Sequence, residues 1–153
     1  MKYQSIQFGW IISLIFAIVL IILIIGYSYN LGQNPIDTTG LLIVGGILLI
    51  ALLCFYQLKV VVRDKTIHLI YGIGLIRIKV KPKNIHELRM VKTPLYWGLG
   101  IRITLEGMLY NIQGTKGVKI TFRDGGRKRT IRIGTPEPEA LMDAIKKEFQ
   151  VSV

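Results

Sequence analysis

The residue types that commonly carry enzyme chemistry are sparse in this chain of 153 residues. Its two histidines, His68 and His86, have no set of further ligands at metal-binding spacing, whereas a zinc site needs three or four converging side chains. Gly72 to Gly74 lacks the third glycine of a dinucleotide-binding loop. Glu106 and Asp124 each fall at a predicted turn and not as a pair of carboxylates. We therefore expect a non-enzymatic protein with no catalytic residues, no metal and no cofactor.

Positive charge is the strongest functional signal in the sequence. The only charged residues before position 59 are Lys2 and Asp37, so the net charge of +11 belongs entirely to the rest of the chain. Such a domain is attracted to anionic lipid, nucleic acid or an acidic protein. A solvated strand face is the alternative for any single cation. The candidate contacts with an anionic surface are Lys59, Arg63, Lys65, Arg77, Lys79, Lys81, Arg127, Lys128 and Arg129.

A second candidate is the aromatic loop TPLYWGLG, which spans residues 93–100. Leu95, Tyr96 and Trp97 supply large amphipathic side chains. They could pack as a plug at the open end of a sheet, which is the interpretation we favour. They could instead reach the lipid interface or hold a partner peptide.

Two long apolar segments precede the basic region, after a short polar start at residues 1–7. Hydrophobic residues make up 51% of the chain, and mean hydropathy is +0.47, as expected for a mixed membrane and soluble protein. The segments predict helices at about 8–29 and 40–57, each long enough to cross a hydrocarbon core of roughly 30 Å. A cleaved signal peptide is disfavoured because the first run is too long and lacks a small-residue cleavage site.

The turn-rich connector at 30–39 makes these helices an antiparallel hairpin, with Thr39 as a candidate N-cap. Gly45 and Gly46 could allow close helix packing, or could simply be tolerated in lipid. The connector contains no Lys or Arg, whereas both outer flanks are basic. The positive-inside rule then predicts a multi-pass cell-membrane protein with both termini and the soluble domain in the cytoplasm.

From Leu58 onward, apolar residues alternate with polar ones, which predicts short antiparallel strands. Asp124-Gly125-Gly126 is typical of a tight hairpin turn. Thr135 and Pro136 can begin a last amphipathic helix at about 136–149. The sequence thus predicts a transmembrane hairpin at 1–58. A mainly β domain follows at 59–153, with about seven strands in a bent sheet or part-open barrel, capped by the C-terminal helix.

Several turn and cap motifs accompany this order of elements. They are Y-G-x-G-L at 71–75, W-G-x-G-I-R at 97–102, Gly117-Val118, and I-G-T-P-E-P at 133–138. With the helix hairpin, they resemble the membrane-anchored bacterial proteins that carry a pleckstrin-homology-like (PH-like) domain. The resemblance implies a seven-stranded, strongly bent sheet capped by a helix. Relatives that bind phosphoinositides specifically carry basic residues around a long loop between the first two strands. Here that loop is expected to be only residues 63–65, so specific phosphoinositide binding is not expected.

We therefore expect a binding or scaffolding module anchored in the membrane, with its basic PH-like domain contacting anionic lipid or an unidentified membrane protein. The alternative is a subunit or assembly factor of a larger membrane complex, acting through the helix hairpin. A second copy of the chain is a further candidate partner. Nucleic-acid binding is disfavoured, since stacking aromatic residues do not accompany Arg127 to Arg129.

Overall fold

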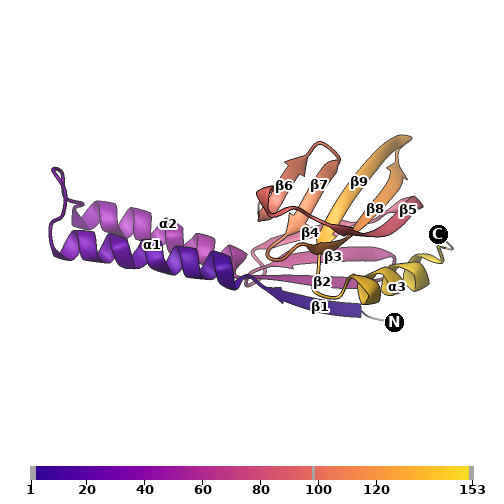
Figure 1. Cartoon of the computed structure of the whole chain (residues 1–153), viewed down its shortest axis with the longest axis horizontal. Helices are drawn as coiled ribbons and strands as arrows, with labels where there is room; N and C mark the ends of the chain where they lie inside the picture. The colour runs from indigo at the N-terminus through magenta and orange to yellow at the C-terminus, as the bar shows by residue number, and fades with distance from the viewer. Residues whose placement is uncertain (1–2, 98, 152–153) are drawn as a thin grey trace.

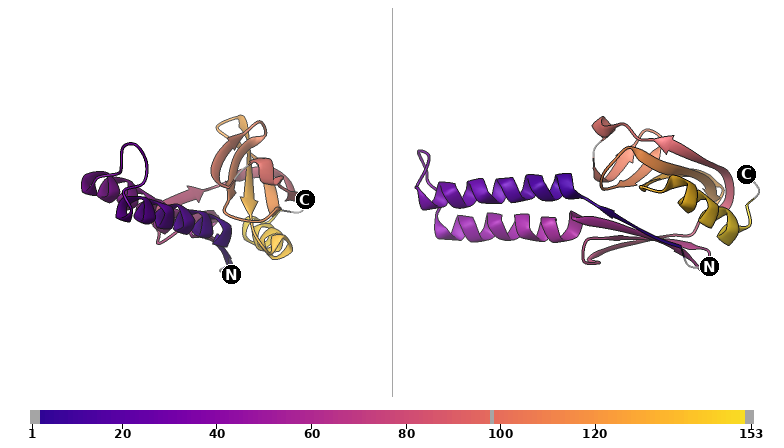
Figure 2. Two further views of the ribbon diagram at one scale, coloured as in Figure 1. Left: turned by 60° about the vertical axis from the view of Figure 1, so that its left-hand side comes forward. Right: turned by 60° about the horizontal axis from the view of Figure 1, so that its bottom comes forward.

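A computed structural model describes residues 3–97 and 99–151, apart from the side chain of Leu95. Lys2, one of the basic residues that flank the helices, and Gly98, part of the W-G-x-G motif, lie outside the described residues. The chain forms a helix hairpin that projects from one end of a β domain, as Figure 1 and both views of Figure 2 show.

The two long apolar helices predicted from the sequence are confirmed. They are α1 (Trp10–Ser28) and α2 (Thr38–Phe55), which lie side by side and are long and apolar enough to span a membrane. No side chain is fully buried within these two described ranges, so both helices expose extensive apolar surface. Asp37 is the N-cap of α2 and accepts a 2.8 Å hydrogen bond from the Gly40 N–H. The prediction of Thr39 as the cap was wrong.

A strand at the N-terminus, β1 (Tyr3–Phe8), was not predicted. It pairs antiparallel with β2 (Gln57–Arg63), from Tyr3 opposite Val62 to Phe8 opposite Gln57. The α1–α2 hairpin is therefore inserted between two neighbouring strands of one sheet. The polar start of the chain is part of the β domain.

The strands form two open sheets. The four-stranded sheet has the order β1-β2-β3-β4, with β3 (Thr66–Tyr71) and β4 (Ile76–Val80). The five-stranded sheet has the order β5-β8-β9-β7-β6. Its strands are β5 (Lys83–Lys92), β6 (Gly100–Thr104), β7 (Gly107–Asn111), β8 (Lys116–Asp124) and β9 (Arg127–Gly134). Strands β7 and β9 run parallel, whereas the other pairs are antiparallel.

The described residues thus contain nine strands, against the seven or so predicted. The coarser prediction of apolar helices, then β structure, then a C-terminal helix is confirmed. That helix, α3, spans Pro138–Phe149, close to the predicted 136–149. The Thr135 hydroxyl accepts a hydrogen bond from the Glu137 N–H (3.2 Å), but Glu137 occupies the N-cap position.

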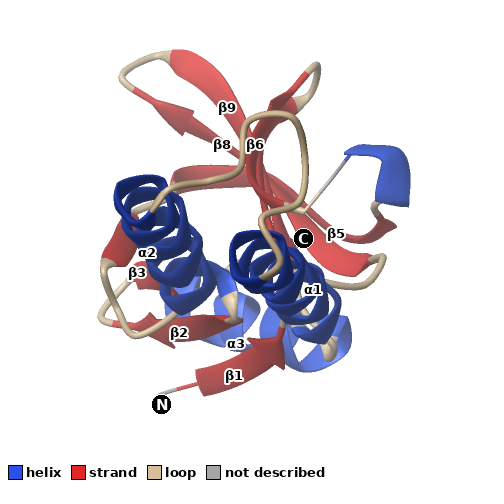
Figure 3. Ribbon diagram, turned by 90° about the vertical axis from the view of Figure 1, so that its left-hand side faces the viewer, coloured by secondary structure: helices blue, strands red, loops and turns tan. Residues whose placement is uncertain are grey.

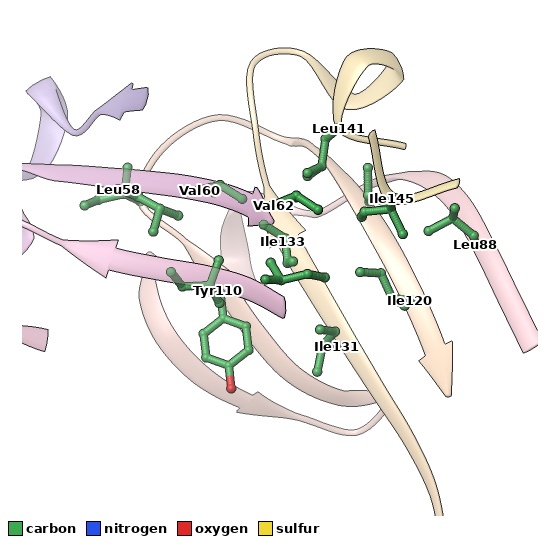
Figure 4. Packing of buried hydrophobic residues seen from close by; sticks show 14 of the residues in the cluster. Leu58, Val60, Val62, Leu88, Tyr110, Ile120, Ile131, Ile133, Leu141 and Ile145 are labelled. Carbon is green, nitrogen blue, oxygen red and sulfur yellow. The ribbon is translucent and has the colours of Figure 1, made fainter. Parts of the chain in front are cut away.

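One apolar core fills the space between the sheets (Figure 4). The alternating residues Leu58, Val60 and Val62 of β2 face Ile120, Ile131 and Ile133 of the five-stranded sheet. Helix α3 adds Leu141 and Ile145 and packs against β1, β2, β5 and β8. Viewed along the hairpin, β1–β3 lie to one side of this core and β6, β8 and β9 to the other (Figure 3).

Candidate interface at the base of the helix hairpin

The chain enters and leaves the helices at neighbouring points. Phe8, the last residue of β1, is paired with Gln57, the first residue of β2. Only Gly9 separates β1 from α1, and only Tyr56 separates α2 from β2. The Gly9 N–H donates to the Tyr56 carbonyl at 2.7 Å. A side chain at Gly9 would come within 3.0 Å of Ile112 and 3.1 Å of the Phe55 carbonyl. Two adjacent connections therefore join the helices to the sheet, which opposes swivelling about either one.

The turn between β3 and β4 strengthens this junction. The Gly72 N–H donates to the Gln57 carbonyl at 2.8 Å, and the Ile73 N–H donates to the Leu53 carbonyl at 3.2 Å. The Gln57 amide returns a 3.1 Å hydrogen bond to the Gly72 carbonyl. Gly72 has φ +56°, and a Cβ there would lie 1.9 Å from the Leu53 oxygen. The β3–β4 connection can pack directly against the last turn of α2 because residue 72 lacks a side chain.

Exposed apolar residues occur in the segments next to the helix base. Ile73 and Leu75 project from the β3–β4 turn and are 57% and 62% exposed, while Tyr96 in the short 3₁₀ helix η1 (Leu95–Trp97) is 85% exposed. The loop after η1 comes close to the helices, since residues 99–102 line a hollow of about 660 Å³ with Ile12, Ile15 and Phe16 of α1 and with Phe55. We call the set Phe8, Trp10, Ile73, Leu75 and Tyr96 the apolar collar.

Cations accompany the apolar collar. The Arg77 Nε–H donates to the Gly74 carbonyl at 2.8 Å, and the Arg102 Nε–H donates to the Leu99 carbonyl at 3.3 Å. Lys59 lies near the start of β2, beside the junction. Apolar and aromatic groups flanked by cations are typical of the head-group region of a bilayer.

The remaining predicted cations lie farther from the helices. Arg63 and Lys65 lie at the opposite end of β2, Lys79 lies along β4, and Lys81 follows the end of β4. Arg127, Lys128 and Arg129 lie at the tip of the β8–β9 hairpin, which points away from the helices (Figure 1). Arg129 is paired there with Asp124 at 3.1 Å. The structure therefore divides the predicted cationic set between the base of the hairpin and the far part of the domain.

Trp97 stacks on the outer face of the five-stranded sheet. Its ring lies 4.5 Å from the guanidinium carbon of Arg132, a buried residue between Ile131 and Ile133, which face the core. Arg132 also pairs with Glu106, which accepts a 3.1 Å contact from Lys119. Hydrogen bonds from Arg132 and Lys119 lower the pKa of the Glu106 carboxyl below its ordinary value of 4.5. Trp97 thus packs on a side chain of the sheet surface, whereas the exposed Tyr96 does not act as a plug.

The two hairpin glycines differ in their surroundings. A Cβ at Gly45 would be 3.8 Å and 3.9 Å from Leu20 and Leu23 of α1, which is ordinary contact, and one at Gly46 would meet nothing within 4 Å. Neither glycine is therefore required for the two helices to approach each other.

His68 lies in β3 and His86 lies in β5, so the two histidines belong to different sheets. Across residues 3–97 and 99–151, no group of three His, Cys, Asp or Glu side chains could hold a metal ion. His68 lies on the outer face of the four-stranded sheet, opposite Val61 and Lys79. Burial and the nearby Arg63 and Lys79 lower its pKa from 6.5.

Part of this interface carries no signal in the sequence. Phe8, Ile73, Leu75 and Arg102 were not singled out, since short turns and strand ends give no local sign that they lie beside a helix. Comparisons with protein-family models, curated proteins and solved structures find no match. Any functional conclusion therefore rests on the residues and geometry described above.

Proposed function

We propose that this protein is a non-enzymatic binding module. Its helix hairpin anchors it in the cell membrane, and its apolar collar holds the β domain at the membrane surface. The observation that carries this proposal is the docking of the β3–β4 turn on α2, through the hydrogen bond from Ile73 to Leu53 and the close approach of Gly72. It holds exposed Ile73 and Leu75 beside the last turn of a helix with transmembrane dimensions. Apolar side chains at that level would enter the interface of the bilayer.

The distribution of charge supports a cytoplasmic domain. The connector between α1 and α2 carries no Lys or Arg, whereas Lys59, Arg77 and Arg102 lie near the other ends of the helices. Near an anionic leaflet, each such cation contributes about 1 kcal/mol. We propose non-specific attraction to anionic lipid through these three residues, on the cytoplasmic side.

We also propose that the β domain is PH-like. If the α1–α2 and β6–β7 hairpins are regarded as insertions, seven strands remain, β1 to β4 in one sheet and β5, β8 and β9 in the other, followed by α3. This arrangement fits the seven strands and final helix that the resemblance implies.

The loop at residues 63–65 occupies a different place in this strand order from the one expected. Residues 63–65 connect the second and third strands, β2 and β3, and not the first two as predicted. The connection between the first two strands is the helix hairpin itself. We therefore propose that this protein uses insertion into the membrane where phosphoinositide-binding relatives use a basic loop.

The test uses the full chain in nanodiscs, because β1 precedes the helices and a fragment starting at residue 59 would lack a strand. A polarity-sensitive fluorophore is attached at Tyr96→Cys in a Cys54→Ser background, since Cys54 is the only cysteine. We expect lipid-borne quenchers to reduce its emission. Replacing Ile73 and Leu75 with Asp should weaken this quenching.

The matched control places Asp at Ile103 and Leu105, two apolar residues that are even more exposed but lie outside the apolar collar. This control should quench as the parent does. Equal quenching in the Ile73→Asp/Leu75→Asp variant and the parent would overturn the assignment of the apolar collar to the membrane.

A further inference from the structure

A large groove opens on the side of the β domain where β4 faces the β6–β7 hairpin and the β8–β9 tip. Its volume is about 920 Å³. Core residues form its floor, and lysines lie along its rim. The floor is formed by Met108, Tyr110, Phe122 and Ile131. Tyr110 points away from the other labelled core residues, with its hydroxyl at the margin of the cluster (Figure 4).

The groove runs along an unpaired strand edge. Strand β4 pairs with β3 on one side, and no described strand pairs with its other side. Ile78 and Val80 face the groove and are only partly buried, whereas their partners Leu69 and Ile67 on β3 are completely buried. An edge that exposes backbone donors, backbone acceptors and apolar side chains is a template for an added strand.

The charge around the groove is unbalanced. Both acidic residues of its lining are already paired, Asp124 with Arg129 and Glu106 with Arg132. Lysines along the rim have no acidic partner among the described residues; they are Lys79, Lys81, Lys83 and Lys128. This potential favours an acidic occupant. It disfavours pairing of β4 with β4 of a second copy, which would bring two lysine-bearing edges together.

The groove is also far from the proposed membrane surface. Strand β4 begins beside the helix junction at the β3–β4 turn, and at about 3.3 Å per residue the path from Gly74 to Lys81 is roughly 23 Å. The screening length at physiological ionic strength is only ~8 Å. The charge of the anchoring bilayer is therefore largely screened at Lys81, and a protein segment fits this position better than lipid head groups do.

We propose that this groove binds an extended acidic segment of a partner protein, which adds a strand to the free edge of β4. Apolar side chains of the segment contact Met108 and Tyr110, and its acidic side chains face Lys81, Lys83 and Lys128. Ile103 and Leu105, both highly exposed on the groove lining, extend the apolar contact. The protein then presents a membrane-fixed docking edge to an acidic partner.

The test measures fluorescence anisotropy of a fluorescein-labelled peptide of alternating Glu and Val residues, with the full chain in nanodiscs of zwitterionic lipid. We expect saturable binding. The variant K81E/K83E/K128E should weaken it about tenfold or more. The control K92E/K116E/K147E makes the same change of net charge at exposed residues that do not line the groove, and should weaken it less than about threefold.

Two further arms separate strand addition from other modes. A peptide N-methylated at alternate residues should not bind, because it cannot complete the backbone ladder. Equal weakening by both triple variants, retained binding of the methylated peptide, or absence of saturable binding would each overturn the proposal. Capture of added anionic vesicles that is lost only in K81E/K83E/K128E would overturn it in favour of a lipid site.

Discussion

Replacing Gly72 with Ala perturbs the contact that docks the β3–β4 turn on α2. Alanine at φ +56° costs about 1 kcal/mol in backbone conformation. Its Cβ would also lie 1.9 Å from the Leu53 oxygen, so the turn must separate from the helix. This displacement of residue 72 breaks the hydrogen bond from Ile73 to Leu53 of α2 and both hydrogen bonds between Gly72 and Gln57 of β2. At about 1 kcal/mol for each of these, the total destabilisation is roughly 4 kcal/mol.

Gly125 is the matched control, because it has nearly the same backbone conformation, φ +57°, and nothing within 4 Å of an added Cβ. Gly125→Ala should cost only about 1 kcal/mol. The assay is urea unfolding of the full chain in detergent micelles, followed by the β-sheet circular dichroism signal. A difference of about 3 kcal/mol between the two variants is expected. Equal destabilisation would refute the docking of the turn on α2.

Three further outcomes follow from the described contacts. The pKa of Glu106 is lower in the folded protein, so its ionised carboxylate stabilises the fold above pH 4.5, and this stabilisation is lost as pH falls through the folded pKa. Glu106→Gln should remove this part of the acid dependence of stability in unfolding experiments. The NMR titration of His68 should have a midpoint below 6.5, and Arg63→Ala should raise it. Gly45→Ala and Gly46→Ala should leave the helix hairpin intact. Thermal stability should be unchanged, and so should the oligomeric state measured by size-exclusion chromatography. A shift in oligomeric state with Gly46→Ala alone would instead implicate contact with a second chain.

The features that the sequence predicted correctly are those with a local signal. The apolar runs of α1 and α2 need no knowledge of tertiary contacts, and the alternation of Leu58, Val60 and Val62 directly indicates a half-buried strand. The C-terminal helix α3 is likewise predicted by its apolar stripe, and two residues of that stripe, Leu141 and Ile145, are buried in the structure.

Strand β1 could not be recognised this way. Its inward positions include the polar Ser5 and Gln7, while Ile6 and Phe8 face outward. The strand exists because β2, which follows the entire helix hairpin, supplies its hydrogen-bonding partner. The residues around β1 in the sequence do not include β2, so they give no sign that residues 3–8 form a strand.

The candidate site shows the same limit. Arg77 and Arg127 look equally good as candidate contacts with an anionic surface in the sequence. In the fold, Arg77 lies beside the helices and Arg127 lies at the distant tip of the β8–β9 hairpin. Ile73 and Leu75 look like ordinary turn residues in the sequence. Their significance comes from hydrogen bonds that join Gly72 and Ile73 to Gln57 and Leu53.

The central claim is that the apolar collar fixes one end of the β domain in the membrane interface while the lysine-rimmed groove stays in water. Electron paramagnetic resonance tests it directly with spin labels at Ile73→Cys and, separately, Lys128→Cys, each in the full-length Cys54→Ser chain in lipid bilayers. The label at residue 73 should be relaxed more by lipid-soluble oxygen, and the label at residue 128 more by a water-soluble nickel complex. A label at residue 73 that is relaxed by nickel as strongly as the one at residue 128 would contradict the claim.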